Sequence, residues 1–285
     1  MDNTFRFGVR GHDIPGGSIE EWAANIRKAG FCSTQLAIPK VFKDRFNTGP
    51  TAFTSGLAMY MREVLSENKV NVAVLGCYYN LATPDREALE KNRNLYKNHI
   101  RFASLLGCGL VGTETGAVNT EYKYEPANHT DEALEKFIEG LKPVVDYAEK
   151  MGVCVGIEPV YKHIMCNPVR TRKVLDAIDS PNLRVILDPI NMLCAENESR
   201  HNDIVDEAFN LFGEEIDVIH LKDYVVKDGQ IISRPVTLGT GNFDIPHLFA
   251  KIKQDKPYIN VLLEDSIPEN VNISKAYAEK VYSEC

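Results

Sequence analysis

Residues 151–157 read MGVCVGI, and this short stretch decides the fold. A glycine, which commonly ends a helix, directly precedes a run of apolar and β-branched residues that is typical of a buried strand. The same junction returns in AGFCSTQL at 29–36 and in LGCGLVGT at 106–113. A junction that recurs along the chain predicts that helices and strands alternate.

Around these junctions the alternation extends over the whole chain. Eight apolar runs have the length and composition of buried strands, at residues 5–10, 31–38, 70–77, 109–113, 153–157, 183–187, 216–221 and 259–263. Amphipathic stretches with helical spacing follow them, at 18–29, 52–67, 85–106, 130–151, 168–178, 203–212, 245–253 and 274–282. Eight successive strand-helix units predict a parallel sheet with helical crossovers, which closes most naturally into a (β/α)₈ TIM barrel of the α/β class.

Local signals at the helix ends agree with this pattern. Ser18 begins a capping box, and Thr130 offers an N-cap before acidic residues. Gly107 and Gly152 stand where a helix would end. The turn after the first strand, residues 11–17, is neither a dinucleotide fingerprint nor a phosphate loop, which argues against an open nucleotide-binding sheet.

We expect one domain over residues 1–285, because barrels of this kind commonly reach that length. The chain is 44% hydrophobic and 25% charged, which is the balance of an ordinary globular protein. No linker-like segment interrupts the pattern. The longest irregular connections, at 39–50, 117–129 and 225–244, are therefore expected to be loops over an active site.

Composition excludes several classes of function. The formal net charge is -8 and no block of Lys and Arg is present, which argues against a nucleic-acid partner. The first residues lack the basic flank and apolar core of a signal peptide, and nowhere do roughly 18 apolar residues run together. We therefore expect no membrane contact and a cytoplasmic location. Seven cysteines without a Cys-x-x-Cys pair are expected to be reduced and mostly buried.

Four consecutive predicted strands end in a residue that could bind a metal ion. These residues are Glu158, Asp188, His220 and Glu264, spaced by 30, 32 and 44 residues, each about one strand-helix unit. In such barrels the active site lies at the carboxyl ends of the strands, so all four side chains should meet at one side of the mouth. Three carboxylates crowded together would be costly without a cation. We predict one divalent metal ion, Mn²⁺, Mg²⁺ or Co²⁺, with Zn²⁺ as a further option.

The motifs around these residues resemble the sugar phosphate isomerase/epimerase superfamily, whose members have xylose isomerase-like barrels. The order of elements is similar along nearly the whole chain. The resemblance implies that the four residues hold the ion, that this ion is often manganese, and that association into a homo-oligomer is compatible with the fold. The matching motifs are EP at 158–159, LDPIN at 187–191, IHLKDY at 219–224, LGTGNFD at 238–244 and LED at 263–265.

Members of this superfamily include ketose epimerases, hydroxypyruvate isomerase, inosose dehydratase and endonuclease IV, so the resemblance implies a site and not a substrate. Asn191 stands where endonuclease IV has an additional histidine, which together with the acidic charge argues against a three-zinc nuclease. Ile164 stands where the tagatose-type epimerases have a second glutamate. The run HLKD at 220–223 is closer to the inosose dehydratase branch.

The ligand set suggests a mechanism. An ion chelated by the carbonyl and hydroxyl of a small sugar-like substrate acidifies the neighbouring C–H bond and stabilises the enediolate. Glu158 and Glu264 are predicted as the catalytic acid/base pair, one on each face of the substrate. Return of the proton to the opposite face gives epimerisation, and return to the next carbon gives isomerisation. Loss of a β-hydroxyl gives dehydration.

Further polar residues near the strand ends are candidates for substrate binding. Lys222 shares a strand face with His220 and could stabilise the enediolate oxygen or form an ion pair with an acidic ligand. Asn191 could bind a hydroxyl or cap the next helix, whereas Asp223 points to the other face and is expected to be structural. The remaining candidates are Glu114, His163, Lys162, Arg10, His12 and Tyr78.

We therefore expect a metal-dependent isomerase or epimerase of a small sugar. Two other functions stay open at this point. A lyase that dehydrates a keto-sugar or keto-inositol would use the same enediolate. A non-catalytic ligand-binding barrel would keep the fold without the chemistry, although the intact set of four ligands argues against it.

Overall fold

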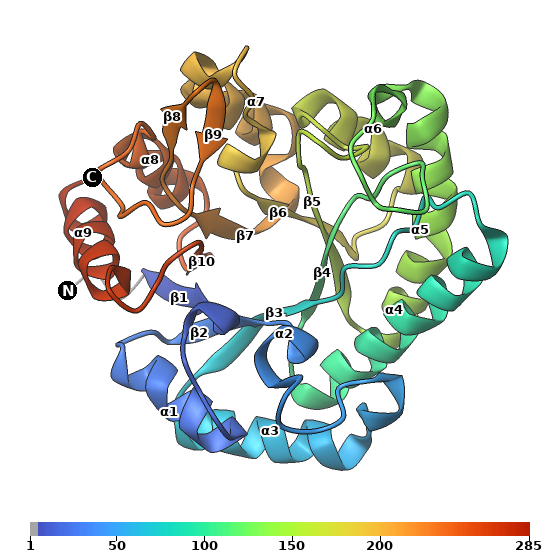
Figure 1. The fold of residues 1–285 in the computed structure, drawn as a ribbon, viewed down its shortest axis with the longest axis horizontal. Coiled ribbons are helices and arrows are strands. Elements are labelled where there is room, and N and C mark those ends of the chain that lie inside the picture. The colour runs from blue at the N-terminus through green and yellow to red at the C-terminus, as the bar shows by residue number, and fades with distance from the viewer. Residues whose placement is uncertain (1–4) are drawn as a thin grey trace.

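Eight parallel strands close into a barrel in the computed structural model, which describes residues 5–285. The strand order is β1-β10-β7-β6-β5-β4-β3-β2, and β1 pairs with both β10 and β2, so that the first and last strands of the barrel meet (Figure 1). The predicted TIM barrel is thereby confirmed. The strands are β1 (Arg6–Arg10), β2 (Ser33–Leu36), β3 (Asn71–Gly76), β4 (Leu110–Glu114), β5 (Cys154–Glu158), β6 (Leu183–Leu187), β7 (Ile216–Leu221) and β10 (Asn260–Leu263).

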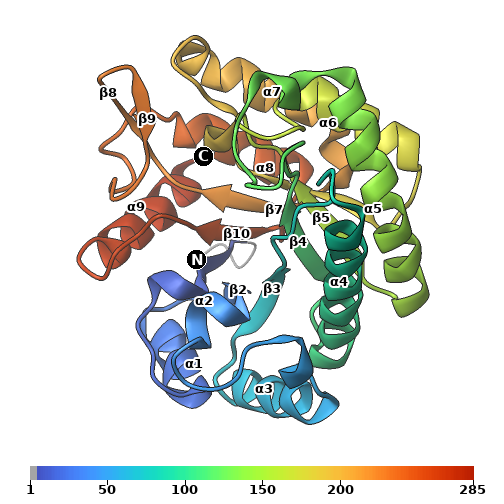
Figure 2. The ribbon, with the colours of Figure 1, turned by 45° about the vertical axis from the view of Figure 1, so that its right-hand side comes forward.

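Helices surround the barrel and lie between consecutive strands, as the turned view also shows (Figure 2). Within residues 5–285, eight of them match the predicted amphipathic stretches: seven connect successive barrel strands, and the last, α9, follows β10. The ninth, α2, is a short helix between β2 and α3. The helices are α1 (Ile19–Lys28), α2 (Ile38–Phe42), α3 (Ser55–Glu67), α4 (Arg86–Leu106), α5 (Asp131–Met151), α6 (Pro168–Ile178), α7 (His201–Phe212), α8 (Ile245–Asp255) and α9 (Val271–Glu284).

The helix ends follow the local signals in the sequence. The Ser18 side chain accepts a hydrogen bond from Glu21 N, and the Glu21 carboxylate accepts one from Ser18 N, which completes the capping box of α1. The Thr130 side chain accepts a hydrogen bond from Ala133 N at the start of α5. Gly107 and Gly152 adopt φ values of 83° and 64° as C-caps, a left-handed conformation that glycine reaches without a Cβ clash.

The interior of the barrel is packed and is not a pore. Ile186 lies at its centre, within a buried cluster that Val74, Leu110, Val218 and Leu262 complete. Two inward-facing glycines make room for it, because an added Cβ would lie 2.8 Å from the Ile186 Cδ1 atom at Gly112 and 3.1 Å from it at Gly156. This apolar layer closes the barrel, so ligands have access only from an end.

Two of the connections predicted as irregular loops contain regular elements. The short helix α2 begins with Pro39 in its first turn and buries Ile38 and Phe42, one turn apart on the same face. The segment 225–244 contains a hairpin of β8 (Val225–Lys227) and β9 (Gln230–Ile232). Its turn residues Asp228 and Gly229 both have positive φ, as an Asp-Gly hairpin turn requires.

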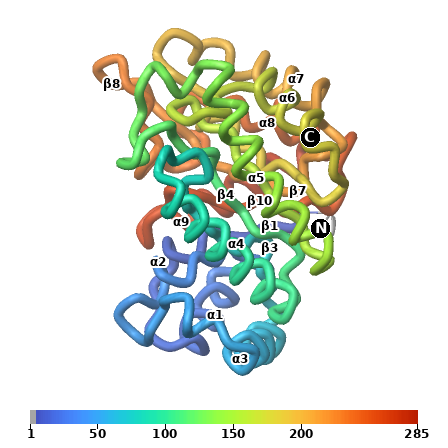
Figure 3. Tube along the Cα trace, turned by 90° about the vertical axis from the view of Figure 1, so that its right-hand side faces the viewer, coloured from blue at the N-terminus to red at the C-terminus, as the bar shows by residue number. Residues whose placement is uncertain are grey.

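The hairpin and α2 lie at the same end of the barrel, whereas the C-terminus lies toward the other end (Figure 3). The seven cysteines form no disulfide among residues 5–285, but only Cys77, Cys108 and Cys166 are buried, so the prediction of mostly buried thiols is wrong. No helix within residues 5–285 is both long enough and apolar enough to cross a membrane.

Candidate metal centre

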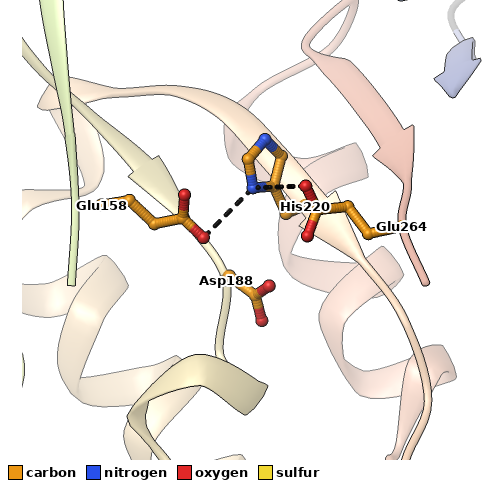
Figure 4. Close-up of side chains that lie close together, drawn as sticks. All are labelled: Glu158, Asp188, His220 and Glu264. Atoms are coloured by element: carbon orange, nitrogen blue, oxygen red, sulfur yellow. Dashed lines mark hydrogen bonds and ion pairs between the residues drawn. The ribbon is translucent and has the colours of Figure 1, made fainter. Parts of the chain in front are cut away.

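The structure brings together the four residues that the sequence selects as metal ligands. Glu158 is the last residue of β5, Asp188 follows β6, His220 lies in β7 and Glu264 follows β10. Because these strands are adjacent and parallel, their carboxyl ends meet at one rim. All four side chains are buried, and one ligand atom from each lies within 4.8 Å of the others (Figure 4).

His220 lies between the two glutamates. Its Nδ1 atom lies 3.2 Å from Glu158 Oε1 and 3.4 Å from Glu264 Oε1 (Figure 4). Burial opposes protonation of the ring, but the carboxylates of Glu264 and Glu158 outweigh it and raise the pKa of His220 to about 9. The protonated ring therefore supplies a positive charge that a bound cation would replace.

Asp188 uses its two oxygens differently. Oδ1 accepts hydrogen bonds from Ile190 N at 3.0 Å and Asn191 N at 3.1 Å, which holds the carboxylate against the short 3₁₀ helix Ile190–Met192. Oδ2 points to the Lys222 ammonium, 2.8 Å away. Burial, together with the negative charges of Glu158 and Glu264, raises the pKa of Asp188 to about 6 although Lys222 lowers it.

Lys222 and Asn191 connect three of the candidate ligands. The Lys222 ammonium donates to Asn191 Oδ1 at 2.6 Å, and Asn191 Nδ2 donates to Glu158 Oε1 at 2.7 Å. Lys222 thus forms the ion pair with an acidic ligand that was one of its two predicted roles. The Asn191 side chain does not cap a helix, because the Asp188 carboxylate accepts the amides at that turn.

Arg10 closes the other side of the site. Its guanidinium donates to Asp265 Oδ1 at 2.7 Å and to Asp13 Oδ2 at 3.1 Å, and it lies 3.6 Å from Glu264 Oε2. Burial raises the pKa of Glu264, but His220, Arg10 and Lys222 together lower it below the usual value. Glu264 therefore stays ionised at neutral pH.

A cavity of about 250 Å³ adjoins the centre and is lined by two of the four candidate ligands, Glu158 and Glu264. Six of the candidate substrate-binding residues also line it, namely Arg10, His12, Tyr78, Glu114, Asn191 and Lys222. Four further lining residues were not predicted from the sequence, namely Gln35, Lys40, Ser233 and Asp265. Two of them carried a usable signal, because Asp265 directly follows Glu264 and Gln35 is a long polar side chain in a strand whose four residues are all buried.

Charge explains why this site suits a divalent cation. Five carboxylates, those of Glu114, Glu158, Asp188, Glu264 and Asp265, surround the cavity and the centre beneath it. Three permanent cations face them, those of Arg10, Lys40 and Lys222. With every carboxylate ionised and the His220 ring in the neutral form that ligation requires, these groups carry a net charge of −2, which one divalent ion would balance. The donor set of three carboxylates and one imidazole is rich in oxygen, as Mn²⁺ and Mg²⁺ prefer.

His12 and Tyr78 also line the cavity. Burial, with the nearby cations Arg10 and Lys40, lowers the pKa of His12 to about 4, so this ring is neutral at pH 7. The Lys40 ammonium lies 4.6 Å from the centre of the Tyr78 ring, and the Tyr78 hydroxyl accepts a hydrogen bond from Gln35 Nε2. The wall thus offers both neutral and charged donors to a polar ligand.

Two predicted substrate contacts lie elsewhere. His163 is not among the described residues that line the cavity, and its Nδ1 atom lies 3.5 Å from Glu114 Oε2. Burial lowers the pKa of His163 to about 4, so the ring is uncharged at neutral pH and packs beside Tyr122. Lys162 points into a neighbouring outer cleft. Both follow Glu158 closely in the chain, but the connection after β5 carries them away from the ion site.

Comparisons with known proteins identify the family. The model of the xylose isomerase-like TIM barrel family matches residues 23–280. No curated protein matches the chain. Among solved structures, a D-tagatose 3-epimerase-like protein is similar over 98% of both chains, with a TM-score of 0.77 and 18% identity. L-ribulose 3-epimerase is similar over 98% of this chain and 95% of its own, with a TM-score of 0.75 and 14% identity.

A 3-keto-D-glucoside 4-epimerase from E. coli is similar over 97% of this chain and 99% of its own, with a TM-score of 0.73 and 14% identity. At such identities the structural likeness establishes the fold, and the substrate has to be argued from the site. The family match covers most of the barrel, including the strands that carry all four candidate ligands. The chain therefore belongs to the xylose isomerase-like TIM barrel family.

Proposed function

We propose that the protein is a divalent-metal-dependent isomerase or epimerase of a small sugar or sugar derivative. The observation that carries this proposal is the buried set of three carboxylates and one imidazole, two of which, Glu158 and Glu264, line a small polar cavity. Three structurally similar proteins are named as sugar epimerases, or as like one, which supports the same class of reaction.

Glu158, Asp188, His220 and Glu264 would hold one ion, with manganese as the first choice. His220 would offer Nδ1, the nitrogen that faces the carboxylates. When bound, the ion polarises the substrate carbonyl and stabilises negative charge on its oxygen. Ligation requires the neutral form of the imidazole, so ion binding should release a proton from His220 at neutral pH.

Proton transfer falls to Glu158 and Glu264 in this proposal. They come from strands separated by β6 and β7, and they flank His220 from opposite sides. A substrate above the centre would have one carboxylate near each face, so that one removes the α proton and the other returns it. The low pKa of Glu264 suits a group that must be ionised to accept a proton.

The other cavity residues would bind and orient the substrate. The Lys222 ammonium lies between Asp188 and Asn191 and could also donate to an enediolate oxygen. Arg10, His12, Tyr78 and Glu114 offer donors and acceptors for hydroxyl groups around the cavity. Such a wall with few apolar groups fits a polyol better than an apolar ligand.

The test is to load the protein with Mn²⁺ and incubate it with small ketoses and inososes in deuterated water. Solvent deuterium at the α carbon without loss of water is the expected result. Loss of water from the substrate would instead assign the lyase reaction. Absence of exchange with every sugar, together with no bound ion after purification without chelator, would favour a non-catalytic barrel. Salt-sensitive DNA binding would point to a nuclease.

A further inference from the structure

A second hollow adjoins the ion-site cavity. This outer cleft has a volume of about 530 Å³ and shares Asn191 and Ser233 with the cavity of about 250 Å³. Pockets for drug-sized molecules measure roughly 300–1,000 Å³, so the inner cavity alone suits one small polyol and the outer cleft adds room for a further group. The connections after β4, β5 and β6 and the β8–β9 hairpin form its walls.

Aromatic rings stand at the rim of the outer cleft. The rings of Tyr124 and Tyr161 are stacked with centres 6.4 Å apart and planes inclined by 22°, and the His129 ring lies 5.5 Å from each. Tyr124 is 47% exposed, so its ring is available to a ligand. Exposed aromatic faces bind the apolar C–H face of a flat ring.

Hydrogen bonds to the backbone of Tyr161 hold this aromatic group in place. Tyr161 N donates to Asn191 O at 2.7 Å, which ties the connection after β5 to the connection after β6. The Tyr161 carbonyl pairs with His129 Nε2 at 2.7 Å. Because these bonds fix Tyr161 in the free protein, little ordering is needed when a ligand stacks on it.

The rest of the lining combines apolar and neutral polar groups. Ile190, Leu193 and Ile231 supply apolar surface, and Gln230 and Ser233 supply hydrogen-bonding groups. The charged residues of the cleft are one cation and one anion, Lys162 and Glu196. A phosphate group is bound by converging cations, which this cleft does not provide. A sugar ring, with an apolar face and a hydroxyl edge, matches the lining.

We infer that the outer cleft binds a second sugar ring, so that the substrate is a glycosylated ketose and not a free or phosphorylated monosaccharide. This inference rests on the proposed function, because the reacting carbonyl must occupy the inner cavity. The second ring then extends past Asn191 and Ser233 onto the Tyr161 and Tyr124 rings. Binding energy gained in the outer cleft would hold the reacting end in position.

The experiment compares D-fructose with disaccharides that carry glucose on its O3, O4, O5 or O6 atom, which are turanose, maltulose, leucrose and isomaltulose. Exchange of the α hydrogen with deuterated water is followed for the Mn²⁺-loaded protein. We expect at least one disaccharide to exchange with a kcat/KM about tenfold or more above that of fructose. Fructose 6-phosphate is included as the phosphorylated competitor and should not exceed fructose.

Two variants test the role of the rings. Tyr161→Ala and Tyr124→Ala should each lower the preference for the best disaccharide over fructose roughly 2- to 10-fold, as loss of one stacking contact implies. Tyr60→Ala on α3, which removes a 45% exposed tyrosine far along the chain from the cleft, is the matched control and should leave the preference unchanged. Thermal unfolding of all three variants checks that each is folded.

The outcomes separate the two proposals. Exchange of fructose with no preferred disaccharide, or a preference for fructose 6-phosphate, overturns the inference and leaves the proposed function standing. A disaccharide preference that survives both tyrosine variants also overturns the assignment to this cleft. Absence of exchange with every sugar contradicts the proposed function and the inference that rests on it.

Discussion

The Lys222 ammonium lies 2.8 Å from Asp188 Oδ2 and 3.8 Å from Glu264 Oε2, so two of the candidate metal ligands share one lysine. All three side chains are buried. Burial alone would lower the pKa of Lys222, but the carboxylates of Asp188, Glu264 and Asp265 raise it above the usual value. The lysine therefore stays charged, and it competes electrostatically with any cation that approaches the same carboxylates.

Lys222→Met should separate two effects of this lysine: its ion pairs stabilise the metal-free protein, and its positive charge opposes the binding of a cation. Without metal the variant should be less stable, because removing one partner of a buried ion pair typically costs about 3–5 kcal/mol. With Mn²⁺ it should gain more stability than the wild type, since the ion no longer approaches a neighbouring positive charge. Thermal unfolding in chelator measures the stability of the metal-free protein, and unfolding in a series of Mn²⁺ concentrations measures the gain from the ion.

Lys40→Met is the control, because it removes a cavity cation for which the structure records no ion pair with the candidate ligands. An equal Mn²⁺ shift in Lys222→Met and the wild type would contradict the prediction.

Glu264→Gln tests the assignment of the catalytic base. The variant keeps the shape and one coordinating oxygen of the side chain but removes its charge and basicity. Loss of a general base typically lowers the rate of proton exchange by about 10²- to 10⁴-fold, or roughly 3 to 5 kcal/mol of barrier. Metal binding, measured by the Mn²⁺-induced shift in unfolding temperature, should weaken only modestly. Glu121→Gln on the surface is the control. Wild-type exchange in Glu264→Gln with metal bound would remove Glu264 from the catalytic role.

Asp223 should prove structural, as its place on the far face of the strand predicts. Its Oδ2 accepts hydrogen bonds from Gly239 N and Gly241 N, both at 2.9 Å, and Oδ1 accepts from Tyr224 N and Phe243 N. Asp223→Asn leaves one acceptor oxygen, so two of the four backbone amides lose their partner.

Unpaired buried donors cost about 1–3 kcal/mol each, and denaturant unfolding of Asp223→Asn should therefore show a loss of roughly 2–6 kcal/mol for the two of them. The Mn²⁺-induced increase in stability should persist, because Asp223 is not one of the candidate ligands. Loss of that increase with unfolding stability intact would instead place Asp223 in the ion site.

His99 on α4 makes stability depend on pH. The ring is 4% exposed, its Nδ1 lies 2.8 Å from Leu95 O, and burial lowers its pKa to about 4. In the unfolded chain histidine has a pKa near ~6.5, so between pH 6.5 and 4 the unfolded state binds the extra proton and stability falls as pH falls.

At pH 4.5 this loss amounts to about 2–3 kcal/mol relative to pH 7. His99→Phe should remove that part of the pH dependence, as denaturant unfolding of wild type and variant in chelator at both pH values would measure. His12 and His163, whose pKa values are also lowered to about 4, contribute in the same direction and remain in the variant. Identical losses in the two proteins would show that His99 is not responsible.

The candidate ligands could be predicted because each belongs to the end of its own strand. Parallel strands of similar length place equivalent ends at one rim, so the spacing of Glu158, Asp188, His220 and Glu264 is sufficient to bring them together. That prediction does not depend on the conformation of any loop. The barrel itself followed for the same reason, from eight strand-helix junctions.

The positions of the remaining cavity residues depend on the conformation of loops, which the hydrophobic periodicity of the sequence does not predict. Lys40 comes from the short helix α2, and Ser233 follows the β8–β9 hairpin. Their approach to the site depends on how these connections fold over the rim. His163 shows the opposite error, because it lies five residues after Glu158 but contacts Glu114. Closeness along the chain does not predict which way a loop directs a side chain.

Arg10 donates a hydrogen bond to Asp265, which lies 255 positions further along the chain. The barrel closes only where β1 meets β10, and one candidate ligand, Glu264, directly follows β10. A nascent chain that ends before that strand has at most three of the four candidate ligands, and one edge of β1 has no partner although the other pairs with β2. Contacts of such long sequence separation form late in folding. The four candidate ligands therefore come together only when β10 has joined the sheet between β1 and β7.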